Sequence, residues 1–373
     1  MTKAAMTIDS PEKLREALGE VQDPIFERTL SDLGSLLEAE LNGQDARVKV
    51  RISSPADTLK EKLNAALIER AKAGGLKSLE IEWDVQVPTR EATSEDPMPS
   101  VKNVILVMSG KGGVGKSTVA ANLTLALKRR GTRVGLLDAD IYGPSVPTML
   151  GISGHPMSKD GKRIIPLERF GAKLMSVGFL LEDPTQAIVW RGPMLHGALQ
   201  QFISDVEWGE LDYLIIDMPP GTGDVALSLA QKAKITGVVV VTTPQEVALQ
   251  DVYKGVSMTK KLNLETLGVV ENMSYFVDPA GNRHELFGAG GGDKVAEFAG
   301  SEVLGRIPIE PEVRDWGDKG TPIVQAAPGS ASAEIFMEIA DKLTEKVAAS
   351  HFARGGGEKA PEASPAKRLR ILR

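Results

Sequence analysis

Eight residues at the end of the first third of the chain have the types and spacing of a phosphate-binding loop. Gly110 to Ser117 match the pattern G-x-x-x-x-G-K-[ST] in full. Glycines let backbone N–H groups turn inward around phosphate oxygens, where a side chain would block their approach. Lys116 can reach the β and γ phosphates of a nucleotide, and the Ser117 hydroxyl can hold Mg2+. The segment therefore predicts a site for a nucleoside triphosphate with Mg2+.

The surrounding sequence supplies the setting that this motif requires. An apolar, β-branched run, Val104 to Met108, precedes the loop, and a helix-like stretch, Thr118 to Arg130, follows it. In a strand-loop-helix unit the positive end of the helix dipole lies beneath the phosphates. The context favours a phosphate-binding loop over a plain glycine-rich turn.

Three aspartates follow further apolar runs and have the chemistry to complete a hydrolytic site. Asp138 and Asp140 come directly after the run Arg133 to Leu137, and Asp217 ends the run Tyr213 to Ile216. Of the first two, one can bind Mg2+ through water, and the other can orient or deprotonate a water that attacks the γ-phosphate. Asp217 matches the Walker B position, which supports Mg2+.

The segment after Asp217 adds a candidate sensor of the γ-phosphate. Pro219 and Pro220 stiffen it, whereas Gly221 frees it and can present a backbone N–H to the γ-phosphate. A loop that orders only around this phosphate would report which nucleotide is bound.

Short β-branched runs alternate with helical stretches from Asn103 onward. Because the runs are almost continuously apolar, they predict a mostly parallel sheet covered by helices on both faces. The predicted fold class is thus α/β, a P-loop NTPase preceded by a small α+β domain. Ligands bind such sheets at the carboxyl ends of the strands, where the motifs fall. The predicted strands are Val104–Met108, Arg133–Leu137, Ala172–Ser176, Tyr213–Ile216, Gly237–Thr242 and Thr266–Glu271.

The chain is long enough for more than one domain. Residues 1–88 are predicted to form the small α+β domain, and the polar, proline-rich residues 89–102 a linker. Residues 103–349 form the predicted nucleotide-binding domain, and the glycine-, proline- and charge-rich residues 350–373 a disordered tail. In the first domain helices are expected at Pro11–Leu18, with Ser10 as N-cap, and at Thr58–Ala73, and strands at Ala46–Ile52 and Ser78–Val87.

Composition narrows the classes of function. A net charge of -6 and a pI near 5.5 argue against a general nucleic-acid coat, which is normally basic. The 373 residues include no cysteine, which excludes disulfides, thiol catalysis and clusters held by thiolates of this chain. The first residues lack the pattern of a secretory signal, and no apolar run approaches the ~20 residues of a membrane span. The expected location is the cytoplasm.

Four segments together resemble the Mrp/ApbC-type iron–sulfur cluster carrier ATPases, a branch of the MinD/ParA group of deviant Walker A ATPases. The resemblance runs from about residue 101 to 346, and the N-terminal unit is similar to the small domain often fused in this family. It implies ATP and Mg2+ as ligands, a homodimer, and client or assembly-factor proteins as partners. The segments are residues 110–117 with Lys111 inside the loop, 138–145, 217–224 and 270–276.

The resemblance also implies roles for individual residues. Lys111 would cross the dimer interface to the phosphates of the partner's ATP, and Asp140 would position the attacking water. Thr118 would contact the α-phosphate. The implied catalytic residues are Lys111, Lys116 and Asp140, and the implied Mg2+ residues are Ser117, Asp138 and Asp217. The implied nucleotide contacts are Gly110, Lys111, Gly112, Gly113, Val114, Gly115, Lys116, Ser117, Thr118 and Gly221, with Asn272, Pro308 and Glu310 at the purine.

The sequence departs from the family pattern at its cysteines. Members that carry clusters usually have a Cys-x-x-Cys pair where this chain has Asp278 and Gly281. The small domain of the family often carries a single cysteine where this chain has Asp57. Iron–sulfur clusters need thiolate ligands, and Asp278 with His284 does not make a closed metal site. The glycine-rich stretch 288–292 is expected to be a packing turn.

Two functions stay open from the sequence. The first is a dimeric ATPase in or near iron–sulfur cluster assembly or transfer that has lost the cluster ligands. The alternative is a MinD/ParA-like positioning or assembly ATPase that recruits a protein, a membrane or a nucleic acid. The last seven residues, 367–373, are basic and aliphatic but too short for a stable membrane anchor. A scaffold without turnover is disfavoured because Lys116, Asp140 and Asp217 are all present.

Overall fold

The computed structural model describes residues 7–92, 96–140, 143–158, 161–180, 192–221, 227, 229–230 and 232–355. The chain divides into two compact units. The first comprises Met1–Ser53, Leu59–Gln86 and Ala348–Arg373, and the second Ser54–Thr58 and Val87–Val347. The units therefore differ from the expected domain limits, because residues 54–58 and the predicted linker belong with the second unit.

The first unit is a three-stranded sheet with two helices. Strands β3 (Leu36–Asn42), β4 (Asp45–Ile52) and β5 (Ser78–Val85) lie in that order, with β4 antiparallel to β3 and parallel to β5. The helices are α1 (Pro11–Gly19) and α2 (Asp57–Ala73), and β1 (Gln22–Asp23) pairs with β2 (Arg28–Thr29).

The predicted elements of this unit are confirmed, and the two-residue strands β1 and β2 and the longer strand β3 were not predicted. The Ser10 side chain caps α1 by accepting a hydrogen bond from the Lys13 N–H at 3.3 Å. Strand β3 reads Leu-Leu-Glu-Ala-Glu-Leu-Asn, and most of these residues favour helices. Pairing with β4 overrides that preference, and the side chains of β3 alternate between its two faces.

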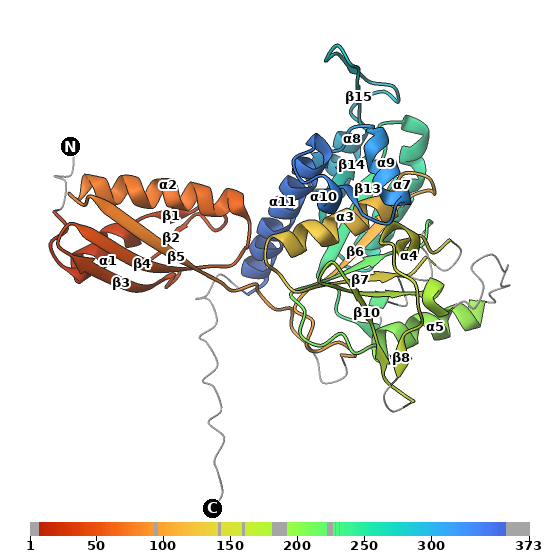
Figure 1. The fold of residues 1–373 in the computed structure, drawn as a ribbon, viewed down its shortest axis with the longest axis horizontal. Coiled ribbons are helices and arrows are strands. Elements are labelled where there is room, and N and C mark those ends of the chain that lie inside the picture. Colours follow the sequence, from red (N-terminus) through yellow and green to blue (C-terminus); the bar gives the residue numbers. More distant parts are fainter. Residues whose placement is uncertain are drawn as a thin grey trace, which may run out of the picture. The chain divides into compact units, whose positions relative to one another are not determined.

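The second unit is built on one eight-stranded sheet (Figure 1). The strand order is β10-β11-β7-β12-β6-β13-β14-β17, and every neighbouring pair is parallel except β10 with β11. The strands are β6 (Val104–Ser109), β7 (Val134–Asp138), β10 (Leu167–Arg169), β11 (Ala172–Ser176), β12 (Tyr213–Asp217), β13 (Gly237–Thr242), β14 (Thr266–Glu271) and β17 (Val303–Arg306). The six predicted strands are present, and β10 and β17 extend the sheet at its edges.

Helices cover both faces of this sheet, as predicted (Figure 1). Ile105 and Val107 of β6 face a core with α3, α10 and α11, whereas Leu106 and Met108 face a core with α5, α7 and α8. Alternate side chains are thus buried on opposite faces, which explains why β6 reads as a continuous apolar run. The helices are α3 (Lys116–Arg129), α4 (Val146–Met149), α5 (Gly192–Ser204), α7 (Glu246–Lys261), α8 (Gly291–Ala299), α9 (Pro311–Asp318), α10 (Ile323–Ala326) and α11 (Ala331–Arg354), with a 3-10 turn η1 (Val177–Leu180).

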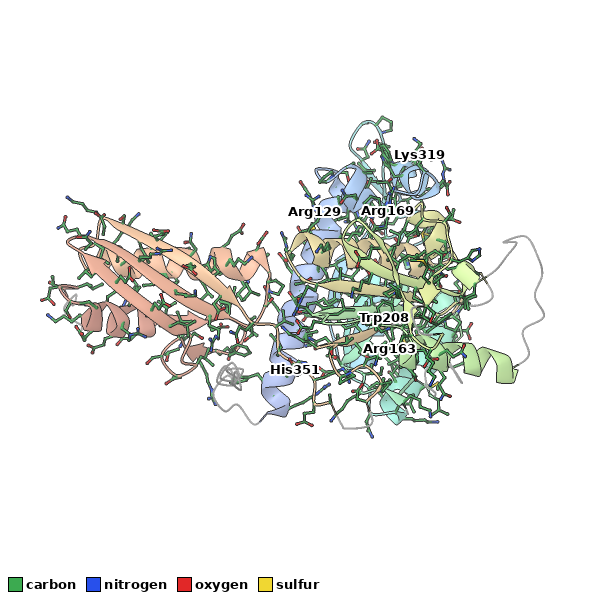
Figure 2. All side chains as sticks on the ribbon, turned by 60° about the horizontal axis from the view of Figure 1, so that its bottom comes forward. Arg129, Arg163, Arg169, Trp208, Lys319 and His351 are labelled. Atoms are coloured by element: carbon green, nitrogen blue, oxygen red, sulfur yellow. The ribbon has the colours of Figure 1, made fainter. Side chains whose placement is uncertain are left out.

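Two short hairpins and a buried tryptophan complete the second unit. Strand β8 (Met157–Ser158) pairs with β9 (Ile164–Ile165), and β15 (Phe276–Val277) pairs with β16 (Arg283–His284). Trp208, labelled in Figure 2, is 2% exposed and donates its Nε1–H to the Phe202 carbonyl at 3.3 Å. This contact joins the end of α5 to the segment that follows it.

The described residues of the segment 88–102, here called the strap, are 88–92 and 96–102, and they pack as part of the second unit. The Arg90 guanidinium forms a two-pronged ion pair with Asp96, and both side chains are 2% exposed. Arg90 also donates to the carbonyls of Met98 at 2.6 Å and Val101 at 3.1 Å. The Lys102 N–H donates to the Leu211 carbonyl at 2.9 Å, so the described part of the strap is held at both ends.

The C-terminal region differs from the predicted tail at its start. Helix α11 continues to Arg354, so residues 350–354 are helical, and Phe352 stacks on Phe26 with ring centroids 4.5 Å apart. The rest of the predicted tail, residues 356–373, lies outside the described residues. Among the described helices, none is both long and apolar enough to cross a membrane.

Candidate nucleotide site

The parallel register brings the predicted site residues to one edge of the sheet. Asp217 at the end of β12 is paired with Asp138 at the end of β7, and Asp138 is paired with Ser176 at the end of β11. On its other side, β12 pairs with β6, which leads directly into the loop Gly110–Ser117. Three sequence motifs, which begin at residues 110, 138 and 217, therefore meet at the carboxyl ends of neighbouring strands.

The loop Gly110–Ser117 has the open backbone that its sequence predicts. Gly113 and Gly115 have φ of +80° and +79°, in the left-handed region that favours glycine. A Cβ on Gly112 or Gly113 would meet no atom within 4 Å, so the space beside them is free. A Cβ on Gly110 would lie 2.3 Å from the Val252 N of α7, which makes this glycine a packing requirement.

Lys116 joins the loop to two of the three aspartates. Its Nζ lies 2.5 Å from Asp217 Oδ1 and 4.0 Å from Asp140 Oδ2, and it is 3.3 Å from the Ser117 hydroxyl oxygen. Lys116 is 6% exposed and Asp217 is fully buried. Four of the predicted catalytic and Mg2+ residues, Lys116, Ser117, Asp140 and Asp217, are thus neighbours in space.

Asp217 retains an oxygen that is suited to a cation. Its Oδ2 is buried and accepts no hydrogen bond from the described residues. Burial raises the pKa of Asp217, against the opposing charge of Lys116. A buried carboxylate oxygen without a donor, next to the Ser117 hydroxyl, fits the hard oxygen ligands that Mg2+ prefers. The donor set present therefore fits the metal that the P-loop implies.

The carboxylate of Asp138 is held by hydrogen bonds from nearby residues of the same chain. Its oxygens accept hydrogen bonds from the Asp140 N–H at 3.1 Å, the Val146 N–H at 3.2 Å and the Ser176 hydroxyl at 3.1 Å. Burial, and secondly the negative charge of Asp217, raise the pKa of Asp138 to about 7. The carboxyl group thereby fixes the backbone that carries Asp140. Ile141 and Tyr142, which follow in the motif, lie outside the described residues.

Other predicted contacts lie around the same loop. Lys111 is half-buried, and its carbonyl accepts a hydrogen bond from the Ser109 hydroxyl at 3.0 Å. The Thr118 hydroxyl lies 3.8 Å from the Met149 sulfur of α4. Gly221 is exposed with φ of +88°, and the residues of its motif that follow, 222–224, lie outside the described residues.

The predicted purine residues lie beyond the end of β14. Asn272 follows β14 directly, and its Nδ2 donates to the Val114 carbonyl of the phosphate-binding loop at 2.9 Å. Pro308 is buried, and Glu310 is half-buried at the start of α9. The Ile309 N–H donates to the Tyr275 carbonyl at 2.6 Å, which joins the two segments.

Two buried polar residues at this edge were not predicted. Ser176 donates to Asp138 and accepts a hydrogen bond from the Gly178 N–H at 3.0 Å. Glu271 is 1% exposed, and its Oε2 accepts the Gly292 N–H at the start of α8 at 2.6 Å. The carboxylate of Glu271 fills the anion-binding end of α8, so the glycine-rich stretch before α8 is a packing turn, as expected. For Glu271, the sequence signal that could have predicted a buried role was a charged residue at the end of an apolar strand.

The hairpin β15–β16 contains Asp278 and Gly281, the positions at which the resemblance implies a pair of cysteines. The Asp278 carboxylate accepts hydrogen bonds from the Ala280 and Asn282 N–H groups, both at 2.9 Å, and contacts His284 Nε2 at 2.7 Å. His284, followed by Asn282, lowers the pKa of Asp278 to about 2. Gly281 has φ of +86°, so it suits the turn. Among the described residues no cluster of three or more His, Asp or Glu side chains forms a metal site.

Comparison with known proteins decides the family. Residues 100–344 match the model of a family described as NUBPL iron-transfer P-loop NTPase. The chain belongs to this family. Residues 11–83 match a second family, described as iron–sulfur cluster assembly protein, and they cover most of the first compact unit.

Two relatives of this NUBPL-family chain are both described as iron–sulfur cluster carrier proteins. The iron–sulfur cluster carrier protein of Deinococcus radiodurans is 46% identical over 340 residues, which are 90% of this chain and 95% of the relative. That of Escherichia coli K12 is 41% identical over 349 residues, 91% and 94% of the two chains. The resemblance predicted from the motifs is thereby confirmed.

A solved structure agrees with the fold. A nucleotide-binding protein from Archaeoglobus fulgidus in complex with ADP is 40% identical, with a TM-score of 0.54, and the match covers 62% of this chain and 92% of that one. The α/β P-loop fold of the second unit is therefore shared with a protein whose structure contains a nucleotide.

Proposed function

We propose that this chain hydrolyses ATP with Mg2+ as a homodimer in the cytoplasm, and that the cycle serves the assembly or transfer of iron–sulfur clusters. The observation that carries the proposal is the buried contact of Lys116 with Asp217, whose other oxygen, Oδ2, accepts no hydrogen bond from the described part of the chain. The family membership and the descriptions of the relatives as cluster carriers support the cluster-related part.

The chemistry follows from the charges at the edge of the sheet. On ATP binding, Lys116 would exchange its contact with Asp217 for the β and γ phosphates, and Asp217 and Ser117 would be the residues that hold Mg2+. Bound Mg2+ neutralises charge on the phosphate oxygens. Asp140, held through its backbone by Asp138, orients the attacking water. Asp138 thus supports the Mg2+ site indirectly, because its carboxylate holds the backbone of Asp140.

The remaining contacts are assigned to the same nucleotide. The loop N–H groups and Thr118 surround the phosphates, Gly221 presents its N–H to the γ-phosphate, and Asn272, Pro308 and Glu310 line the purine. Lys111 reaches the ATP of the partner protomer, so each active site is complete only in the dimer. A lysine near the developing negative charge stabilises both the dimer and the transition state.

The cluster is the cargo of this cycle, and this chain does not hold it with thiolates of its own. With no cysteine in the chain, and with Asp278 committed to its own hairpin, we propose that thiolates of a client or assembly protein hold the cluster. The chain then supplies the nucleotide-driven change of conformation.

One paired experiment tests both halves of the proposal. Purified chain is assayed for phosphate release from ATP with Mg2+ and with EDTA, and is separately reconstituted without oxygen with iron and sulfide. We expect Mg2+-dependent release and no stoichiometric cluster by absorbance or iron content. Absence of turnover would contradict the ATPase assignment, and a stable cluster on the chain alone would contradict the assignment of the ligands to a partner.

A further inference from the structure

Helix α7 carries a groove along its outer side, here called the α7 groove. The opposite side of the helix is buried in the core beside the sheet through Leu249, Val252 and Val256. The groove has a volume of about 480 Å3 and is lined by Gln250, Tyr253, Lys254, Ser257, Met258 and Lys261. We propose that the α7 groove is a docking site for an acidic segment of a partner protein. It lies outside the proposed nucleotide contacts, so the inference does not depend on ATP hydrolysis.

The spacing of the lining residues indicates what shape of ligand the groove suits. They recur three and four positions apart, so they form one continuous face of the helix. Partner segments bind such faces by laying side chains along them. A small-molecule site normally encloses most of its ligand, whereas this groove is lined by a single helix. A peptide segment therefore suits the groove better than a small ligand.

The floor of the groove is apolar and continues onto the neighbouring helix α8. Tyr253 and Met258 are half-buried, with Ser257 between them. The Tyr253 ring packs against the ring of Phe298 on α8, with ring centroids 4.8 Å apart, and Phe298 is 42% exposed. Helices α7 and α8 lie side by side on the sheet (Figure 1). Because tyrosine, phenylalanine and methionine are enriched at protein interfaces, this floor suits aromatic or aliphatic side chains of a partner.

The rim of the groove is positively charged. Lys254 and Lys261 are exposed, and none of the six lining residues is acidic. Lys254 Nζ lies 3.0 Å from Asp251 Oδ1, but both side chains are exposed, so this pair contributes little. Lys260 adds a third cation, with its Nζ 4.9 Å from the centroid of the Phe298 ring. Asp and Glu side chains of a partner would complement these charges.

A protein partner fits these charges better than a nucleic acid or a membrane. Phosphate surfaces are bound through many cations at once, and the groove and its surroundings offer three. The net charge of the whole chain is -6, which opposes a general attraction to either surface. The apolar floor between the lysines has a use only for a ligand that also carries apolar side chains.

Helix α7 is a rigid support for the groove. A Cβ on Gly110 would lie 2.3 Å from the Val252 backbone nitrogen, so the helix backbone packs closely against the neighbouring loop. Lys260 Nζ also donates to the Phe298 carbonyl of α8 at 2.5 Å. A partner that binds a preformed groove loses less free energy in ordering it.

The test lets the groove select its own ligand. A library of random peptides is selected for binding to the full chain, and the enriched peptides are measured by fluorescence anisotropy. The measurement is repeated on a double variant, Lys254→Glu with Lys261→Glu. The matched control is Lys62→Glu with Lys72→Glu, because it makes the same change of charge at two exposed lysines of helix α2. Phosphatidylserine vesicles and duplex DNA are tested on the same proteins, and circular dichroism checks that each is folded.

We expect the selected peptides to combine Asp and Glu with aromatic or aliphatic residues. The α7 double variant should bind them about tenfold more weakly, since two attractions become repulsions, and the control should bind like the parent. Selection of neutral or basic peptides, failure to select any, or equal binding to the α7 variant and the parent would overturn the inference. Vesicles or DNA that bind the parent but not the α7 variant would overturn it in favour of an anionic surface.

Discussion

Lys116 is a buried cation that depends on carboxylates for its charge balance. Its Nζ contacts Asp217 and Asp140, and the second oxygen of Asp217 is buried and accepts no hydrogen bond from the described residues. Arrival of phosphates and Mg2+ would supply both Lys116 and Asp217 with new partners of opposite charge. The charges of Lys116 and Asp217 therefore suit a nucleotide-binding site better than a purely structural ion pair.

The two lysines of the loop provide a prediction at the scale of single residues. Lys116→Ala is expected to abolish ATP binding, because it removes the buried cation that meets the β and γ phosphates. Lys111→Ala is expected to keep ATP binding but to lose ATP-dependent dimerisation and hydrolysis. Calorimetry, light scattering and phosphate release measure the three properties. A Lys111→Ala variant that hydrolyses ATP like the parent would show that this lysine does not act across a dimer.

The residue types of the site could be predicted from sequence because the chemistry fixes them. Glycines, Lys116, Ser117 and an aspartate at a strand end are required in that order by phosphate and Mg2+. The hydrogen bonds from Asn272 to Val114 and from Gly292 to Glu271 could not, since both join segments that only the folded sheet brings together. The sequence around each residue therefore contains no pattern that indicates its hydrogen-bond partner.

At the scale of elements, the strap shows how composition can mislead. Its polar and proline-rich sequence predicted a linker, yet Arg90 and Asp96 are buried together and Arg90 binds two further carbonyls. Each charge alone would be typical of an exposed loop. Burial of these charges is favourable only because they pair with each other. The two residues are six positions apart in a segment without helix or strand periodicity, so no sequence pattern indicates the pair.

The strap yields a prediction on stability. Arg90→Ala leaves Asp96 buried without its partner, and we expect the free energy of unfolding to fall by about 3–5 kcal/mol in urea titrations. Lys234→Ala, which breaks the exposed pair with Glu91, is the control and should leave the midpoint unchanged. Equal, small effects of the two substitutions would mean that the buried pair does not anchor the strap.

The hairpin β15–β16 yields a prediction on pH. The pKa of Asp278 is lowered from 3.8 to about 2, so the contact with His284 stabilises the hairpin above pH 3.8 and is lost as the pH falls through about 2. His284→Ala should move the carboxyl titration of Asp278 upward, toward its ordinary range, in carbon-detected NMR. An unchanged titration in the variant would remove His284 as the main cause.

At the scale of the whole molecule, the central sheet was the most predictable part. Strands buried on both faces must be continuously apolar, and six such runs identified six strands and their parallel arrangement. The edge strands β10 and β17 are short and partly exposed, so they lack that signal. Two units were expected, but their limits differ from the expected domain limits, because residues 54–58 and those from 348 onward are assigned by contacts that are distant in sequence.

The central claim is that ATP is hydrolysed in two sites that each draw on both protomers. The most direct measurement mixes two inactive variants, Lys111→Ala and Asp140→Ala, and follows phosphate release. A mixed dimer carries one complete site, formed by Asp140 of the first variant and Lys111 of the second. At protein concentrations high enough to drive the weakened Lys111→Ala chain into dimers, random pairing in equal amounts predicts roughly a quarter of the parent rate, because half of the dimers are mixed. No recovery, with both variants folded and bound to ATP, would contradict the shared site.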